Sequence, residues 1–129
     1  MNEFRVVTAD RLEGFVGDLL LAVGADEEVA AEVARHLVRA NLSGHDSHGV
    51  LRIPRYVRQV DEGTLVPGAR PVLVHERESV AVFDVCGSFG QYATVVALDW
   101  AMNRAREHGL AAASASTASE RPTPASWRR

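Results

Sequence analysis

The most informative part of the sequence is residues 44–56, which read Gly-His-Asp-Ser-His-Gly-Val-Leu-Arg-Ile-Pro-Arg-Tyr. Placed on a helix at about 100° per residue, this region and the residues after it have one polar and one apolar arc. The polar arc contains His48, Arg52, Arg55, Tyr56 and Gln59, and the apolar arc contains Val50, Ile53, Val57 and Val60. The spacing therefore predicts a helix over 47–62 with one face toward a core.

The polar arc is typical of a site for a small anionic substrate. Arg52 can hold a carboxylate through two parallel hydrogen bonds. His48 lies near the predicted helix start, where the helix dipole and Arg52 disfavour imidazolium while a bound carboxylate favours it. These opposing influences suit proton transfer near neutral pH. Tyr56 can donate to a substrate oxygen, and Ser47 is interpreted as the helix cap.

Other interpretations of these residues remain open. His48 can be an ordinary surface residue at a helix start. His45 and His48, with Asp46 between them, have a spacing that a metal site can use, but a third ligand is not evident, so we expect no metal. Cys86 is expected to pack as a small apolar residue. Residues 87–90 read Gly-Ser-Phe-Gly, a turn that could approach a phosphate through the following helix, although two glycines are a weak signal.

Apolar spacing and glycine stops divide the rest of the chain. Helices are predicted over 8–23, where Asp10 and Glu13 form a capping box, over 26–44 and over 89–108. Two β-rich runs, 72–75 and 79–85, form a predicted hairpin joined by residues 76–78, and a further strand begins at 110–113. We therefore expect an α+β fold with a helical domain at 1–66, the beginning of a β/α domain at 67–113, and a disordered low-complexity tail at 114–129.

Composition excludes several classes of function. The net charge of −3 argues against a nucleic-acid-binding protein, including a small helix-turn-helix module, and against a polybasic membrane anchor. All 14 basic residues are arginine, so lysine Schiff-base chemistry and the Gly-Lys-Ser/Thr phosphate loop are absent. No segment reads Gly-x-Gly-x-x-Gly, and no apolar run approaches the ~20 residues of a membrane span. A lone cysteine fits a reducing, cytoplasmic setting.

A family resemblance rests on residues 46–56, with Gly63 and Pro67 after them. They resemble the malate/L-lactate dehydrogenase family of NAD(P)-dependent oxidoreductases, which includes sulfolactate dehydrogenase, ureidoglycolate dehydrogenase and 2,3-diketogulonate reductase. Matching residues also occur at 41–44, 89–91 and 105–109, so the resemblance covers about residues 8–113.

The resemblance implies hydride transfer between NAD or NADP and C2 of a 2-hydroxy or 2-oxo acid. His48 matches the catalytic proton donor and acceptor, Arg52 the residue that orients the substrate carboxylate, and Tyr56 a position lining the same pocket. The resemblance further implies a helical domain followed by a non-Rossmann nucleotide-binding domain, and a cytoplasmic homodimer.

The resemblance ends where the Ala/Ser/Pro/Arg-rich tail begins. The cofactor-binding residues of the family lie almost wholly beyond that point. The alternative expectation is therefore an inactive, truncated or frameshifted fragment that lacks the cofactor site. A sheet left incomplete in this way exposes a strand edge and an apolar face, which predicts marginal stability or self-association.

Overall fold

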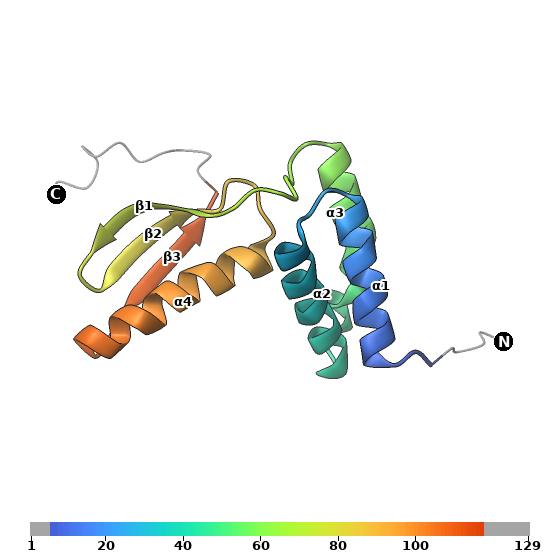
Figure 1. Ribbon diagram of the computed structural model, residues 1–129, viewed down its shortest axis with the longest axis horizontal. Coiled ribbons are helices and arrows are strands. Elements are labelled where there is room, and N and C mark those ends of the chain that lie inside the picture. Colours follow the sequence, from blue (N-terminus) through green and yellow to red (C-terminus); the bar gives the residue numbers. More distant parts are fainter. Residues whose placement is uncertain (1–5, 118–129) are drawn as a thin grey trace. The chain divides into compact units, whose positions relative to one another are not determined.

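The computed structural model describes residues 6–117. These residues form two compact units (Figure 1). Of the described residues, unit 1 comprises those from 6 to 69 together with Gly87–Tyr92, and unit 2 comprises Arg70–Cys86 and residues 93–117. The architecture is the predicted α+β arrangement, with a helical part followed by the beginning of a β/α part. In the region that the structure describes, no helix is both long and apolar enough to cross a membrane.

Unit 1 is built on two amphipathic helices, α1 (Ala9–Ala22) and α2 (Glu27–Leu42). Their apolar faces supply most of its core, which includes Val16, Leu20, Val29, Val33 and Leu37. The Asp26 carboxylate caps α2 by accepting a 2.9 Å hydrogen bond from the Val29 N–H. The predicted capping box on α1 is wrong, because Thr8 is the N-cap and Asp10 lies inside the first turn.

The segment after α2 is not the single helix that its spacing predicts. It forms a 3-10 turn η1 (Asp46–His48), a second 3-10 turn η2 (Val50–Arg52) and only then the helix α3 (Ile53–Asp61). Gly49 separates the two turns with an extended backbone, φ −90° and ψ −153°. Pro54 falls in the first turn of α3, where its missing N–H costs no hydrogen bond, and so it does not kink a helix interior.

Unit 2 is a three-stranded sheet with one helix on it. Strands β1 (Val72–Arg77) and β2 (Val80–Asp84) form the predicted antiparallel hairpin, although its turn is Glu78-Ser79 rather than 76–78. Helix α4 (Gly90–His108) then crosses to β3 (Ala112–Ser116), which pairs in parallel with β2 in the order β1-β2-β3.

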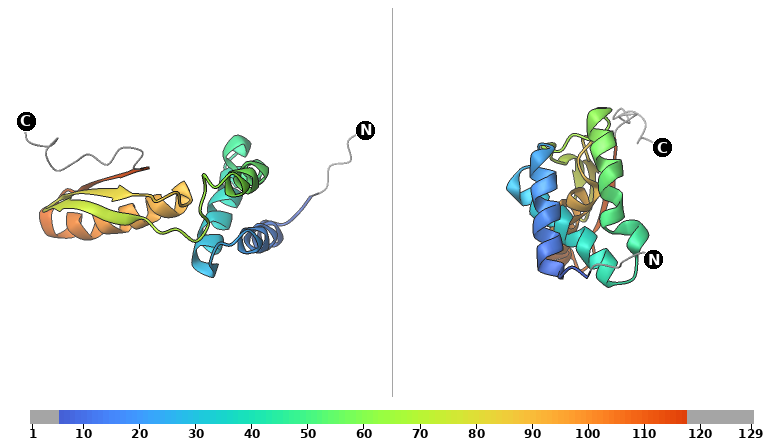
Figure 2. Two further views of the ribbon diagram at one scale, coloured as in Figure 1. Left: turned by 90° about the horizontal axis from the view of Figure 1, so that it is seen from above. Right: turned by 90° about the vertical axis from the view of Figure 1, so that its right-hand side faces the viewer.

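Helix α4 lies along one face of this sheet (Figure 2). The core between them consists of Ala81, Phe83 and Ala97, with Val96, Trp100 and Ala113 packed against it.

Strand β3 corrects the predicted start of the tail. Disorder was expected from residue 114, yet Ser114, Ala115 and Ser116 pair with Val82, Phe83 and Asp84 of β2. Backbone hydrogen bonds hold a strand that has only alanine and serine side chains, and composition gives no sign of them. The remainder of the predicted tail, residues 118–129, lies outside the described residues.

Candidate active site: the 45–52 segment

Ser47 links the two predicted functional residues. The Ser47 Oγ lies 3.1 Å from the His48 Nδ1, and the Arg52 Nε donates a 3.1 Å hydrogen bond to the Ser47 backbone oxygen. The His48 side chain is exposed, and Arg52 is half-buried. Ser47 thus contacts both side chains, His48 through its hydroxyl and Arg52 through its backbone oxygen.

This arrangement leaves reactive atoms available on both side chains. When the Ser47 hydroxyl donates to Nδ1, the neutral imidazole carries its proton on Nε2, which becomes a proton donor for a ligand. Arg52 uses only Nε for Ser47, so its two terminal amino groups remain to bind a carboxylate. Among residues 6–117, Arg52 forms no ion pair that would compete for them.

Tyr56 does not share that exposed face. It is buried in unit 1, where its ring packs edge-on against Phe89 with the ring centroids 5.4 Å apart. The Gln91 Nε2 donates a 2.6 Å hydrogen bond to its hydroxyl. The predicted common arc is wrong because two 3-10 turns and the extended Gly49 change the phase of the segment. The role of Tyr56 in lining a substrate pocket stays a prediction.

Two neighbouring predictions are also corrected. Ser47 does not cap a helix, since it lies inside η1, whose N-cap is His45. Cys86 does not pack as an apolar residue. It is exposed in a tight turn with φ 53°, and its backbone N–H donates a 2.9 Å hydrogen bond to the Asp84 Oδ1. Within the described residues, no three His, Cys, Asp or Glu side chains gather where they could hold a metal ion.

Asn41 also contacts this segment, although it lies before the 44–56 motif and is not predicted as a site residue. Its Nδ2 donates to the Asp46 Oδ1 at 2.6 Å, and its Oδ1 accepts from the Val50 N–H at 2.9 Å. A signal for Asn41 exists in the sequence. It continues the four-residue spacing of the buried Val29, Val33 and Leu37 on α2, which makes it a polar residue at the end of an apolar stripe.

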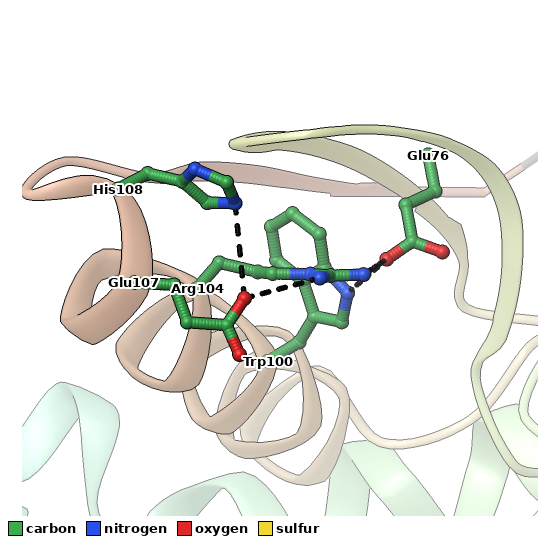
Figure 3. A network of polar contacts seen from close by, with 5 residues as sticks. All are labelled: Glu76, Trp100, Arg104, Glu107 and His108. Carbon is green, nitrogen blue, oxygen red and sulfur yellow. Dashed lines mark hydrogen bonds and ion pairs between the residues drawn. The ribbon is translucent and has the colours of Figure 1, made fainter.

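A second polar cluster occurs in unit 2, where Glu76 of β1 contacts residues in the C-terminal half of α4 (Figure 3). The Arg104 guanidinium pairs with Glu76, and the Trp100 Nε1 donates to the same carboxylate at 3.1 Å. Arg104 also lies 5.7 Å from the Trp100 ring centroid and 3.4 Å from the Glu107 Oε2. His108 reaches Glu107 at 3.8 Å. Every charge here already has a protein partner, so the cluster attaches β1 to α4.

Electrostatics in this cluster follow from the Glu76–Arg104 pair. Hydrogen bonds from Arg104 and then from Trp100 lower the pKa of Glu76. The same pairing raises the pKa of Arg104. Both effects favour the charged forms and hence the contact between strand and helix.

Comparison with known proteins places the chain in a family. Residues 7–121 match the profile of the malate/L-lactate dehydrogenase family. The chain is 38% identical over 104 residues to hydroxycarboxylate dehydrogenase B of Escherichia coli O157:H7, which covers 81% of this chain and 29% of that protein. It is 31% identical over 104 residues to 2,3-diketo-L-gulonate reductase of Escherichia coli O1:K1 / APEC, again with 81% of this chain covered and 31% of that protein.

Solved structures of proteins from this family have the same fold over most of this chain. A malate dehydrogenase from Pyrococcus horikoshii OT3 superposes with a TM-score of 0.84 at 31% identity, covering 89% of this chain and 33% of that one. Sulfolactate dehydrogenase from Methanocaldococcus jannaschii gives 0.83 at 27% identity, covering 86% and 32%. The chain therefore spans about a third of the length of these proteins. Matched over most of its own length in both sequence and fold, the chain belongs to the malate/L-lactate dehydrogenase family.

Proposed function

We propose that residues 45–52 bind a small 2-hydroxy or 2-oxo carboxylic acid and exchange a proton with it, as the substrate side of an oxidoreductase. The observation that carries this proposal is the double contact of Ser47 with the His48 imidazole and the Arg52 guanidinium. The names of the relatives, which include a hydroxycarboxylate dehydrogenase and a 2,3-diketo-L-gulonate reductase, support the same substrate class.

The proposed roles follow from the chemistry of the two side chains. The terminal amino groups of Arg52 bind the carboxylate and so orient the adjacent C2 oxygen. His48 donates a proton to that oxygen in reduction of a 2-oxo acid and accepts it back in oxidation of a 2-hydroxy acid. Tyr56, on α3, packs against Phe89 and is proposed to hold that helix in place next to the site.

The turn at residues 87–90, predicted as a weak phosphate site, does not present its central side chains to a phosphate. The turn between β2 and α4 reads Gly-Ser-Phe-Gly, and both Ser88 and Phe89 in it are buried rather than open to a phosphate. The predicted NAD or NADP therefore enters the proposal only as the hydride partner of the reaction. Within residues 6–117, the proposal assigns substrate binding and proton transfer to the 45–52 segment.

Calorimetry with oxamate, an isostere of pyruvate, tests the binding half of the proposal. The 129-residue chain is expected to bind oxamate, and Arg52→Gln is expected to weaken binding at least tenfold, because one charge-assisted hydrogen-bond pair is lost. Arg55→Gln is the matched control, since Arg55 is an exposed arginine three residues along the chain. Equal loss in both variants, or binding that Arg52→Gln leaves intact, contradicts the proposal.

Turnover decides whether this chain carries out the complete reaction or is the inactive fragment. The chain is incubated with NADH or NADPH and a panel of 2-oxo acids, and cofactor oxidation is followed by absorbance. Oxamate binding without turnover supports a substrate segment that lacks its hydride partner. Turnover that His48→Gln abolishes assigns the complete reaction to this chain.

A further inference from the structure

A single side-chain amide holds both ends of the His48 segment. The Asn41 Nδ2 donates to the carboxylate of Asp46 at 2.6 Å, and the Asn41 Oδ1 accepts from the backbone N–H of Val50 at 2.9 Å. These two contacts bracket Ser47 and His48. Asn41 itself lies in the last turn of α2, so the segment is attached to the helix that carries much of the unit 1 core.

The residue at position 49 must be small for this contact to form. Gly49 is buried, and a Cβ built on it would overlap the terminal atoms of the Asn41 amide. Its φ of −90° is ordinary, so the requirement comes from close approach and not from backbone conformation. The glycine that follows His48 is therefore explained by the amide that lies against it.

The two ends of the amide need different partners. The Nδ2 donor matches an ionised Asp46, which accepts only, and the Oδ1 acceptor matches a backbone N–H, which donates only. A carboxylate at position 41 could still accept from Val50 but would repel Asp46. An alanine at this position would satisfy neither group.

We infer that Asn41 is a positioning residue for proton transfer. It holds the Asp46 side chain before His48 and the Val50 backbone after it, and so sets the direction of the imidazole relative to Arg52 without touching the substrate. This inference rests on the proposed function of His48 and Arg52. It also predicts a change in the free chain that needs no substrate, namely a different environment of the His48 ring when Asn41 is altered.

A charge exchange tests the inference. Asn41→Asp is expected to shift the ring nitrogen signals of His48 in NMR spectra and to weaken oxamate binding about tenfold. Adding Asp46→Asn restores a complementary pair, since an amide at 46 donates to a carboxylate at 41 while that carboxylate still accepts from Val50. The double variant is therefore expected to recover the wild-type His48 signals and most of the affinity.

Controls separate this inference from folding and from the proposed function. Asn103→Asp changes an exposed asparagine of α4 and is expected to leave His48 unaffected. Thermal melting identifies variants that lose the fold, and the double variant decides the question if Asn41→Asp is one of them. Unchanged His48 signals in a folded Asn41→Asp variant, or no rescue in the double variant, overturn the inference. Oxamate binding that Arg52→Gln does not reduce refutes the proposed function instead, whatever Asn41 does.

Discussion

At the scale of single residues, the spacing of the site residues in the sequence predicts only some of their contacts in the folded chain. His48 and Arg52 are four residues apart and each contacts Ser47, while their joint role stays a prediction from the sequence. The burial of Tyr56 could not be predicted, because the extended backbone at Gly49 interrupts the regular helix that the spacing assumes. Asn41 lies on the preceding helix, and only folding brings it to Asp46 and Val50.

Gly49 provides a prediction about packing. Gly49→Ala is expected to lower the free energy of unfolding by about 1–3 kcal/mol, because its new methyl group overlaps the Asn41 amide. Gly14→Ala is the matched control. Gly14 lies inside α1 with open space around its Cα, and alanine there is expected to stabilise by about 0.5–1 kcal/mol. Denaturant titrations measure both. Stabilisation by Gly49→Ala would show that the close contact is absent.

Tyr56 provides a second prediction at this scale. Tyr56→Phe keeps the ring packed on Phe89 but removes the hydrogen bond from Gln91, so a loss of about 0.5–1.5 kcal/mol in stability is expected. Chemical denaturation measures the loss, and oxamate calorimetry on the same variant shows whether the hydroxyl also serves the ligand. An unchanged unfolding midpoint argues against a stabilising hydrogen bond between Gln91 and Tyr56.

At the scale of elements, the sequence predicts those parts whose stability is local. Helices α1, α2 and α4 show apolar spacing that ends at a glycine, and Gly24 and Gly109 indeed have positive φ values of 100° and 79°. The β1–β2 hairpin follows from two β-rich runs close together. The 3-10 turns over residues 46–52 could not be predicted, since they depend on the contact with Asn41. The end of β3 could not be predicted either, since it depends on backbone pairing with β2.

Helices α1 and α2 differ in whether a side chain caps their first turn, so removing each N-cap side chain should have a different effect. Asp26→Ala is expected to cost about 1 kcal/mol of stability because the Val29 N–H loses its acceptor. Thr8→Ala is expected to cost less, since the Thr8 side chain makes no capping hydrogen bond. Thermal and denaturant unfolding of the two variants compare the helices directly. Equal losses would contradict the assignment of Asp26 as the working cap.

The β1–α4 cluster gives a prediction about pH. Because Arg104 and Trp100 lower the pKa of Glu76 in the folded chain, Glu76 contributes stability that is complete above the ordinary glutamate pKa of about 4.3. That contribution is lost as the pH falls through the lowered value. The difference in stability between wild type and Glu76→Gln is therefore expected to be largest near neutral pH and to shrink in acid.

Unfolding curves collected from neutral to acid pH measure this difference. Glu78→Gln in the neighbouring turn is the control, and it is expected to leave the pH dependence close to that of wild type. A Glu76→Gln effect that is the same at every pH would remove the electrostatic explanation.

At the scale of the whole molecule, the sheet of unit 2 is covered on only one of its faces by the described residues. Every residue of β1 is exposed, and Val72 and Val80 keep 52% and 51% of their surface accessible. Exposed apolar side chains on a sheet favour association. The predicted homodimer and the predicted self-association both remain proposals for this chain.

Association can be measured directly. Sedimentation velocity over a range of concentrations is expected to show reversible self-association of the wild-type chain, and Val80→Lys is expected to reduce it by placing a charge on the exposed surface. Val6→Lys, which changes an exposed valine that precedes α1, is the control. A monomer at every concentration with a cooperative melt contradicts this expectation.

The central claim is that His48 and Arg52 form one carboxylate site, and histidine-resolved NMR during an oxamate titration tests it most directly. The chain has five histidines, and three of them, His36, His75 and His108, lie outside the 45–52 segment and serve as internal references. We predict that the His48 ring signals and the Arg52 side-chain N–H signal shift together and saturate at one dissociation constant. The signals of the three reference histidines are expected to stay unchanged, and Arg52→Gln is expected to abolish the His48 shift. A His48 signal that does not respond, or five histidines that shift in parallel, would contradict the account.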